Sequence, residues 1–195
     1  MTEFITKIKS YFLENSHIIR KFWINQFAAS VLGIMVTWPA NIITEKYPAM
    51  GILPTLAALL FCGGFFCFLI YDVIYEEANK DYIRITNQKE TYDGYKALKL
   101  IMFSYAPTIL LAVLAVLFFV INFGDGYAIV SILLNTLIHG MYVGLFFVLP
   151  SGINPLAFPL GILATVFFGC LAYFLGVRDL TLRGVFGIKV KQNKE

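Results

Sequence analysis

Long apolar runs separated by short polar segments form the dominant pattern of the chain. Four of these runs cover residues 22–43, 49–75, 100–123 and 158–177, and a fifth covers 128–149. A helix needs about 20 predominantly apolar residues to cross the ~30 Å hydrocarbon core of a bilayer, and each run reaches that length. The pattern therefore predicts an all-α, polytopic membrane protein.

The number of spans depends on the run 128–149. Positive charge distinguishes two topologies, because basic residues gather on the cytoplasmic side of a membrane. The chain has 15 basic residues, of which none lies between 124 and 158 and five lie from Arg178 onward. If 128–149 is an outer interfacial or re-entrant helix, 14 of the 15 are cytoplasmic. A four-helix transmembrane bundle with this extra outer helix is favoured, and five spans is the alternative.

A single transmembrane domain, residues 1–195, accounts for the whole chain, because no internal repeat or low-complexity tract is visible. The charge distribution predicts that both termini lie in the cytoplasm. The expected location is the plasma membrane of a bacterium. Its parts outside the spans are expected to be a cytoplasmic interfacial helix (1–21), a cytoplasmic loop (76–99), the outer helix (128–149) and a cytoplasmic tail (178–195).

Composition narrows the classes of function. Apolar residues make up 59% of the chain and charged residues 14%, against roughly 45–50% and 25% in soluble domains. The net charge of +3 comes from basic and acidic residues that alternate, so no continuous cationic face is available to nucleic acid. The three cysteines lie in apolar runs without the paired spacing of a zinc site. No nucleic-acid partner, metal or other cofactor is therefore expected.

An acidic cluster follows the second apolar run. On a continuous helix Asp72, Glu76 and Lys80 lie at successive i+4 positions, near the membrane surface. A neighbouring stripe of the same helix holds Glu77, Asp81 and Arg84. Because an acid near hydrocarbon is costly unless it is paired, Asp72 and Glu76 are candidates for holding a proton or an ion. Two carboxylates do not complete the shell of a hard cation, however, and a salt-bridged helix extension is the favoured interpretation.

The run 128–149 carries a second candidate site. Ser131, Asn135 and His139 recur every four residues, so one face of the predicted helix is polar. A neutral imidazole beside Asn135 can relay protons or line a solute path. In the favoured alternative, His139 only donates a hydrogen bond to a neighbouring helix.

Small residues at helical spacing predict the seams where helices meet. They include Gly140 and Gly144 in one helix, and Gly161 and Gly169 in another. In lipid, helices associate through close contact more than through hydrophobic exclusion, and small residues permit that contact. Packing within the chain is the favoured use of these glycines, and a dimer interface is the alternative.

No recognised catalytic motif is present, so an enzyme is not the expected function. The favoured hypothesis is a small non-enzymatic accessory or scaffold subunit of a membrane complex. Its partners would be the lipid bilayer and either a second copy of the chain or another membrane protein. The alternative is a small solute or ion transporter or channel component that uses the Asp72/Glu76 region and His139. A membrane-embedded enzyme using the same carboxylates ranks third.

Overall fold

The chain folds into helices joined by short turns. A computed structural model describes residues 2–89 and 91–180, and no strand occurs in that part. The helices are α1 (Thr2–Glu14), α2 (Ser16–Lys46), α3 (Leu53–Thr86), α4 (Lys96–Val120), α5 (Gly124–Leu133), α6 (Gly144–Val148) and α7 (Ala157–Gly176). Shorter turns are η1 (Pro48–Met50), η2 (Leu134–Ile138), η3 (Gly140–Tyr142) and η4 (Ser151–Leu156). The all-α prediction is confirmed for these residues, and the predicted tail lies outside them beyond Leu180.

Four helices are long and apolar enough to cross a membrane. They are Ser16–Lys46, Leu53–Thr86, Lys96–Val120 and Ser151–Gly176, the last of which combines η4 with α7. Large apolar side chains project outward from them and are exposed, among them Met35, Leu60, Leu110 and Leu163. Lipid is the solvent in which such a surface is stable, because helices in a membrane need no polar outer face. The four helices fit a multi-pass membrane protein.

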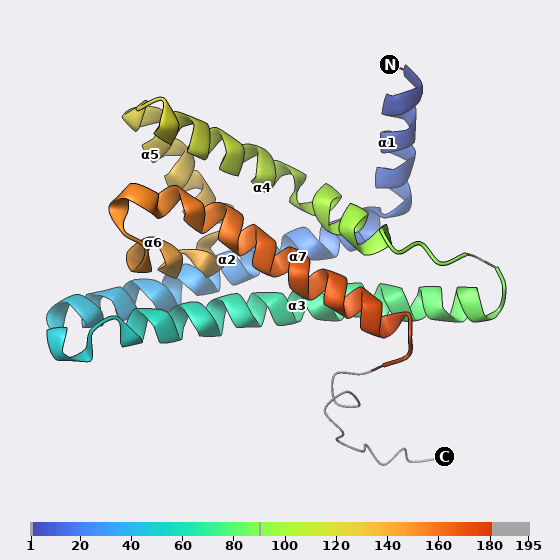
Figure 1. Ribbon diagram of the computed structural model, residues 1–195, viewed down its shortest axis with the longest axis horizontal. Helices are drawn as coiled ribbons and strands as arrows, with labels where there is room; N and C mark the ends of the chain where they lie inside the picture. The colour runs from blue at the N-terminus through green and yellow to red at the C-terminus, as the bar shows by residue number, and fades with distance from the viewer. Residues whose placement is uncertain (1, 90, 181–195) are drawn as a thin grey trace, which may run out of the picture.

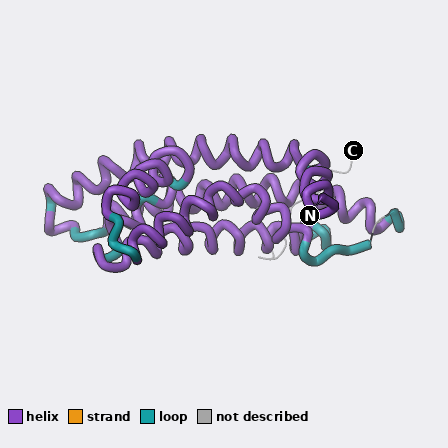
Figure 2. Tube along the Cα trace, turned by 90° about the horizontal axis from the view of Figure 1, so that it is seen from above, coloured by secondary structure: helices purple, strands orange, loops and turns teal. Residues whose placement is uncertain are grey.

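α2 and α3 run along the long axis of the molecule, and α4 and α7 are inclined to them in Figure 1. Seen from above, the helices form one elongated bundle (Figure 2). α2 and α3 form an antiparallel pair, and α7 packs against α3 (Figure 1). Their shared core contains Phe22, Phe66 and Tyr105, none of which is exposed. The Phe22 ring meets those of Phe66 and Tyr105 edge-on, with centroids 6.2 and 5.1 Å apart. These aromatic contacts fasten α2, α3 and α4 to one another.

The two ends of the bundle, called the turn end and the charged end, contain different elements. At the turn end, α2 is joined to α3 through η1, and α4 leads into α5 (Figure 1). At the charged end, α2 begins, α3 ends and α4 begins, and this end carries Lys21, Glu76 and Lys96.

α3 continues well beyond the length of a membrane span. Its 34 residues cover about 51 Å at ~1.5 Å per residue, against a ~30 Å hydrocarbon core. Most of the segment predicted as the loop 76–99 is therefore helical, since α3 runs to Thr86 and α4 begins at Lys96. The Glu76–Lys80 ion pair at i+4 supports this extension.

The N-terminal segment is divided at Asn15. α1 ends at Glu14, and residues 16–21 belong to α2 instead of continuing a single helix over 1–21. The side-chain amide nitrogen of Asn15 donates to the Tyr11 carbonyl oxygen over 2.9 Å. This carbonyl belongs to the last turn of α1, where helices leave carbonyl groups without intrahelical partners. α1 stands away from the bundle in Figure 1, and the Tyr11 ring contacts Phe103 of α4 at 4.8 Å.

Residues 124–148, called the bent segment below, do not form one straight helix. The legs Gly124–Ile138 and Gly140–Val148 meet at an angle of 100°. The first leg starts near Phe118, at the end of α4. It ends at the level of Thr108, because the Gln26 side chain donates hydrogen bonds both to Thr108 and to the Ile138 carbonyl oxygen. The single helix expected over 128–149 is therefore replaced by two legs joined near His139.

The second leg returns toward the turn end. The Gly140 amide donates to Ser30 Oγ over 2.7 Å, and Gly144 lies against Thr37, two helical turns further along α2. Both legs consequently occupy the half of the molecule that contains the turn end (Figure 1). Tyr142 contacts Cys67, about 21 Å along α3 from its first residue, and Ile138 contacts Gln26, about 30 Å along α2 from its last residue.

Candidate functional site

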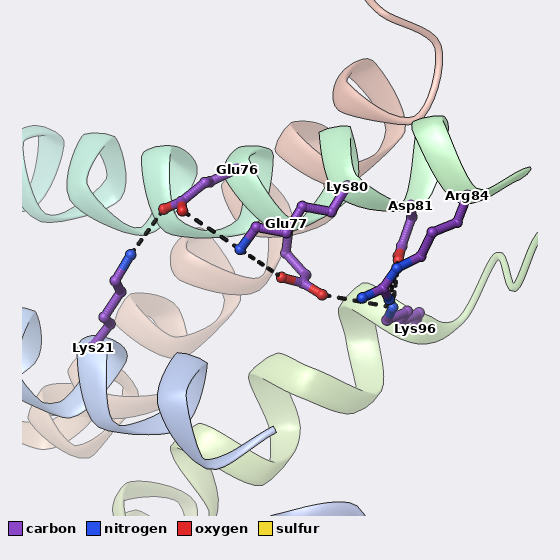
Figure 3. Close-up of polar contacts among 7 residues, drawn as sticks. All are labelled: Lys21, Glu76, Glu77, Lys80, Asp81, Arg84 and Lys96. Atoms are coloured by element: carbon purple, nitrogen blue, oxygen red, sulfur yellow. Dashed lines mark hydrogen bonds and ion pairs between the residues drawn. The ribbon is translucent and has the colours of Figure 1, made fainter. Parts of the chain in front are cut away.

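A network of ion pairs joins three helices at the charged end, and Figure 3 shows its side chains pointing toward one another. This charged cluster consists of Lys21, Glu76, Glu77, Lys80, Asp81, Arg84 and Lys96. α3 supplies five of these residues because its continuous helix repeats the i+3 and i+4 spacing. α2 and α4 supply the two lysines at the ends of the network.

Asp81 is the buried centre of the charged cluster, with 2% of its surface exposed. Lys96 Nζ donates to Asp81 Oδ1 over 2.7 Å, and the Tyr173 hydroxyl donates to Oδ2 over 2.9 Å. Arg84 lies 3.6 Å from the same carboxylate. A buried carboxylate is stable only when it is paired and hydrogen-bonded, and Asp81 meets both conditions. The residue thereby ties α3 to α4 and α7.

Glu76 lies at the exposed edge of the charged cluster. Lys21 Nζ donates to Glu76 Oε2 over 2.9 Å, and the side chains of the pair are 39% and 50% exposed. The hydrogen bond and charge of Lys21 hold the pKa of Glu76 below its usual value of 4.5, against a weaker opposing effect of burial. Glu77 sits between Lys80 and Lys96, at 3.4 and 3.9 Å.

The predicted pairing of Asp72 with Glu76 does not form a joint site. Glu76 is engaged by Lys21 and Lys80, whereas Asp72 is exposed and makes no hydrogen bond or ion pair with the described residues. Among residues 2–89 and 91–180, no group of three or more His, Cys, Asp or Glu side chains is placed to hold a metal ion. The acidic segment acts here as a brace between helices.

His139 lies at the bend between the two legs of the bent segment and is completely buried. Neither ring nitrogen makes a hydrogen bond of normal geometry within the described residues, although the backbone of Ala157 and Phe158 is close. The ring packs 5.0 Å from Tyr142 and 5.9 Å from Phe158. Asn135 is half-buried, and its side-chain oxygen also has no hydrogen-bond partner there.

A second polar network, of uncharged groups, lies in the interior beside His139. The Tyr142 hydroxyl is 3.0 Å from Thr165 Oγ1 and 3.2 Å from Cys67 Sγ, and the Tyr105 hydroxyl is 3.2 Å from the same Thr165 oxygen. These bonds join α3, α4, η3 and α7. Sequence reasoning did not identify this network; the only available signal was that Thr165 lies in the row of small residues from Gly161.

The four predicted packing glycines lie at contacts within the chain. A Cβ atom on Gly140 would stand 2.6 Å from Ser30 Oγ, and one on Gly144 would stand 2.8 Å from Leu59. On Gly161 it would meet the ring of His139 at 2.5 Å, and on Gly169 it would overlap the side chain of Ile101. All four residues are buried, so their close approaches join the bent segment to α2 and α3, and α7 to the rest of the bundle.

Two cavities lie near these polar groups. One of about 260 Å³ at the charged end is lined by groups of both signs, among them Glu77, Arg84 and Lys96. Another of about 380 Å³ lies beside Gln26 and Pro107. Neither is lined by Asp72 or His139.

The two networks suit different tasks. The charged cluster fixes helix ends, and the uncharged network with the glycines fixes the bent segment in the interior. A scan against protein-family models finds no matching family, and neither a curated protein nor a solved structure matches the chain.

Proposed function

We propose that the chain is a multi-pass protein of a bacterial plasma membrane, with four spans, a re-entrant bent segment and both termini in the cytoplasm. Its bent segment enters from the turn end, reaches the level of Gln26 and Cys67, and returns. Non-helical backbone at membrane depth is tolerated where protein covers it, and here α2 and α3 cover it. This arrangement puts 14 of the 15 basic residues on the cytoplasmic side.

Within that topology, the function best supported is that of a non-enzymatic accessory or scaffold subunit of a membrane complex. The observation that carries this proposal is a braced structure at the charged end. It is called the platform and consists of α1, the end of α3 (76–86), the described connection (87–89 and 91–95) and the start of α4. The charged cluster holds the end of α3 to the start of α4, Tyr11 of α1 packs on Phe103 of α4, and Asp93 of the connection pairs with Lys99. These contacts order the outer surface of the platform before any partner binds.

The platform presents large side chains to solvent. Ile83, Tyr92 and Tyr95 are 58%, 55% and 70% exposed, and they lie in the polar segment between two spans. Aromatic and aliphatic groups on an ordered polar surface are typical of contact sites between proteins. The partner would therefore be a protein that reaches the cytoplasmic face, either a second copy of this chain or another membrane component.

Purification from native membranes in a mild detergent tests this proposal. We expect the wild-type chain to copurify with one partner in fixed proportion, or to elute as a defined oligomer. Tyr95→Ser should abolish that association, whereas Lys89→Ser, a control at an exposed position of the same connection, should preserve it. A chain that elutes alone as a monomer, or an association that Tyr95→Ser leaves intact, would contradict the proposal.

A solute or ion transporter or channel component is the second candidate, and the bent segment favours it. Broken helices at membrane depth recur at the binding sites of transporters, and the bend here carries His139, which is buried without a normal hydrogen bond. The described contacts of His139 are with Tyr142 and Phe158, and those of Glu76 are with Lys21 and Lys80, so this candidate is proposed on His139 alone. Flux into proteoliposomes that His139→Gln reduces and Asp72→Asn does not would establish it, and absence of flux for the wild-type chain would exclude it.

A further inference from the structure

A cavity of about 410 Å³ lies between the bent segment and the outer half of α2. Its walls come from α2, from both legs of the bent segment and from η4, and they include Trp38, Tyr127, Ser131, Asn135, Phe146 and Asn154. The volume falls within the range of about 300–1,000 Å³ that is usual for small-molecule sites. The cavity is separate from the charged cluster and from the contacts assigned to the platform.

Two residues that line this cavity carry a polar atom with no hydrogen-bond partner among the described residues. Ser131 is only 9% exposed, and its hydroxyl makes no hydrogen bond with the described residues. The buried side-chain oxygen of Asn135, one helical turn further along the same leg, also has none. Buried polar atoms are nearly always hydrogen-bonded in native proteins, so two unsatisfied atoms in one cavity indicate a missing partner.

The remaining walls define the rest of that partner. The described lining residues carry no charge, and an ion in such surroundings would have no counter-ion. Trp38, Phe146 and Phe147 supply flat apolar surface. We propose that the cavity binds a small neutral molecule whose N–H or O–H group donates to Asn135 and Ser131 and whose apolar, planar body lies against the aromatic rings. This site extends beyond the accessory function and does not depend on it.

The place of the cavity indicates how the molecule arrives. Trp38 and Asn154 lie toward the turn end, which is the outer side in the proposed topology. A water-borne solute and the neutral headgroup of an outer-leaflet lipid both offer the required donor. Their shared chemistry is an amide or hydroxyl group attached to an apolar body.

The two tryptophans of the chain provide a direct measurement. Trp38 lines this cavity, whereas Trp23 lies beside Gln26 in the separate 380 Å³ cavity. In the Trp23→Phe variant, intact and in lipid nanodiscs, emission therefore reports on Trp38 alone. The Trp38→Phe variant reports on Trp23 and serves as the matched control.

Three probes of similar shape separate the possible chemistries. Phenylacetamide has the donor, phenylacetate replaces it with a charge, and ethylbenzene has neither. We expect a saturable change of Trp38 emission with phenylacetamide, about tenfold weaker binding of the other two, and no saturable change of Trp23 emission. The proposal is wrong if phenylacetamide binding does not saturate, which is the result expected if water alone occupies the site at Ser131 and Asn135. It is also wrong if phenylacetate binds equally well.

Variants of the two polar groups complete the test. Asn135→Leu and Ser131→Ala should each weaken phenylacetamide binding, and Asn135→Leu, the larger change, should weaken it about tenfold. The control variant Asn25→Leu on α2 should leave the affinity unchanged. Ser131→Ala removes only one oxygen and so gives a folded variant if Asn135→Leu does not fold. Unchanged affinity in the folded variants would contradict the proposal. If the natural ligand is a lipid headgroup, replacing phosphatidylcholine in the nanodisc with a neutral glycolipid should weaken phenylacetamide binding by competition. If the natural ligand is a water-borne solute, the affinity should not depend on that exchange.

Discussion

Replacing the buried carboxylate of Asp81 with an amide should destabilise the helix bundle more than any single change at its exposed ion pairs. Asp81→Asn keeps the size of the side chain and an oxygen that accepts from Tyr173. It removes the negative charge that faces Lys96 at 2.7 Å and Arg84 at 3.6 Å. The perturbation is therefore electrostatic and leaves the packing of α3 against α7 intact.

The magnitude follows from the burial of each partner. Removing one partner of a fully buried ion pair costs about 3–5 kcal/mol. The Lys96 side chain is 21% exposed and keeps Glu77 at 3.9 Å, so part of its charge is still solvated or paired. We therefore expect a loss of about 2 kcal/mol, in the range of one hydrogen bond to a charged group, which lowers Tm by about 4–8 °C in a chain of this size.

Thiol labelling during a temperature ramp measures this loss. Cys62 and Cys67 are 0% and 4% exposed, so a thiol-reactive dye reaches them only when the bundle opens. Glu76→Gln is the matched control, because it breaks a pair whose members are 39% and 50% exposed. An exposed pair contributes about 0.5 kcal/mol, so the control should lower Tm by about 2 °C. A Tm for Asp81→Asn equal to that of the control, or higher, would refute the assignment of Asp81 as the centre of the charged cluster.

Three further predictions concern the two networks. Because Lys21 lowers the pKa of Glu76, the stability that this pair contributes should be constant above about pH 4.5 and should decline as the pH falls through the lowered pKa. Denaturant titrations at several pH values measure this decline, and Glu76→Gln should abolish the contribution of this group to it. Gly33→Ala should cost about 1–3 kcal/mol because its Cβ would overlap the backbone of the bent segment, whereas Gly64→Ala, which meets open space, should cost nothing in the same thermal assay. Tyr142→Phe removes the hydroxyl that joins Cys67 and Thr165 and should cost about 1 kcal/mol, with faster labelling of Cys67; equal labelling rates would contradict that role.

The sequence was sufficient to predict features that depend on local pattern. The four apolar runs correspond to four long helices because span length and apolarity are properties of consecutive residues. The i+4 spacing of Glu76 and Lys80 likewise predicts a contact that the helix then forms, at 3.5 Å.

The features that depend on tertiary packing could not be predicted in this way. Asp81 meets Lys96 and Tyr173 across separations of 15 and 92 residues, and no local spacing marks either partner. No proline lies near the bend at His139 in the sequence, so the sequence pattern does not indicate the bend. Two hydrogen bonds hold it, from the Gly140 amide to Ser30 Oγ and from Ser30 Oγ to the Thr136 carbonyl oxygen, together with the close approach of Gly140 to α2. These contacts depend on where α2 lies.

The proposed topology places both termini on the same side of the membrane, and one labelling measurement tests it most directly. A tag placed after Glu195 is exposed to a membrane-impermeant reagent in intact and in permeabilised bacterial cells. Four spans with a re-entrant bent segment predict that the tag reacts only after permeabilisation. Reaction in intact cells would mean that the bent segment crosses the membrane as a fifth span, and it would contradict the proposed topology.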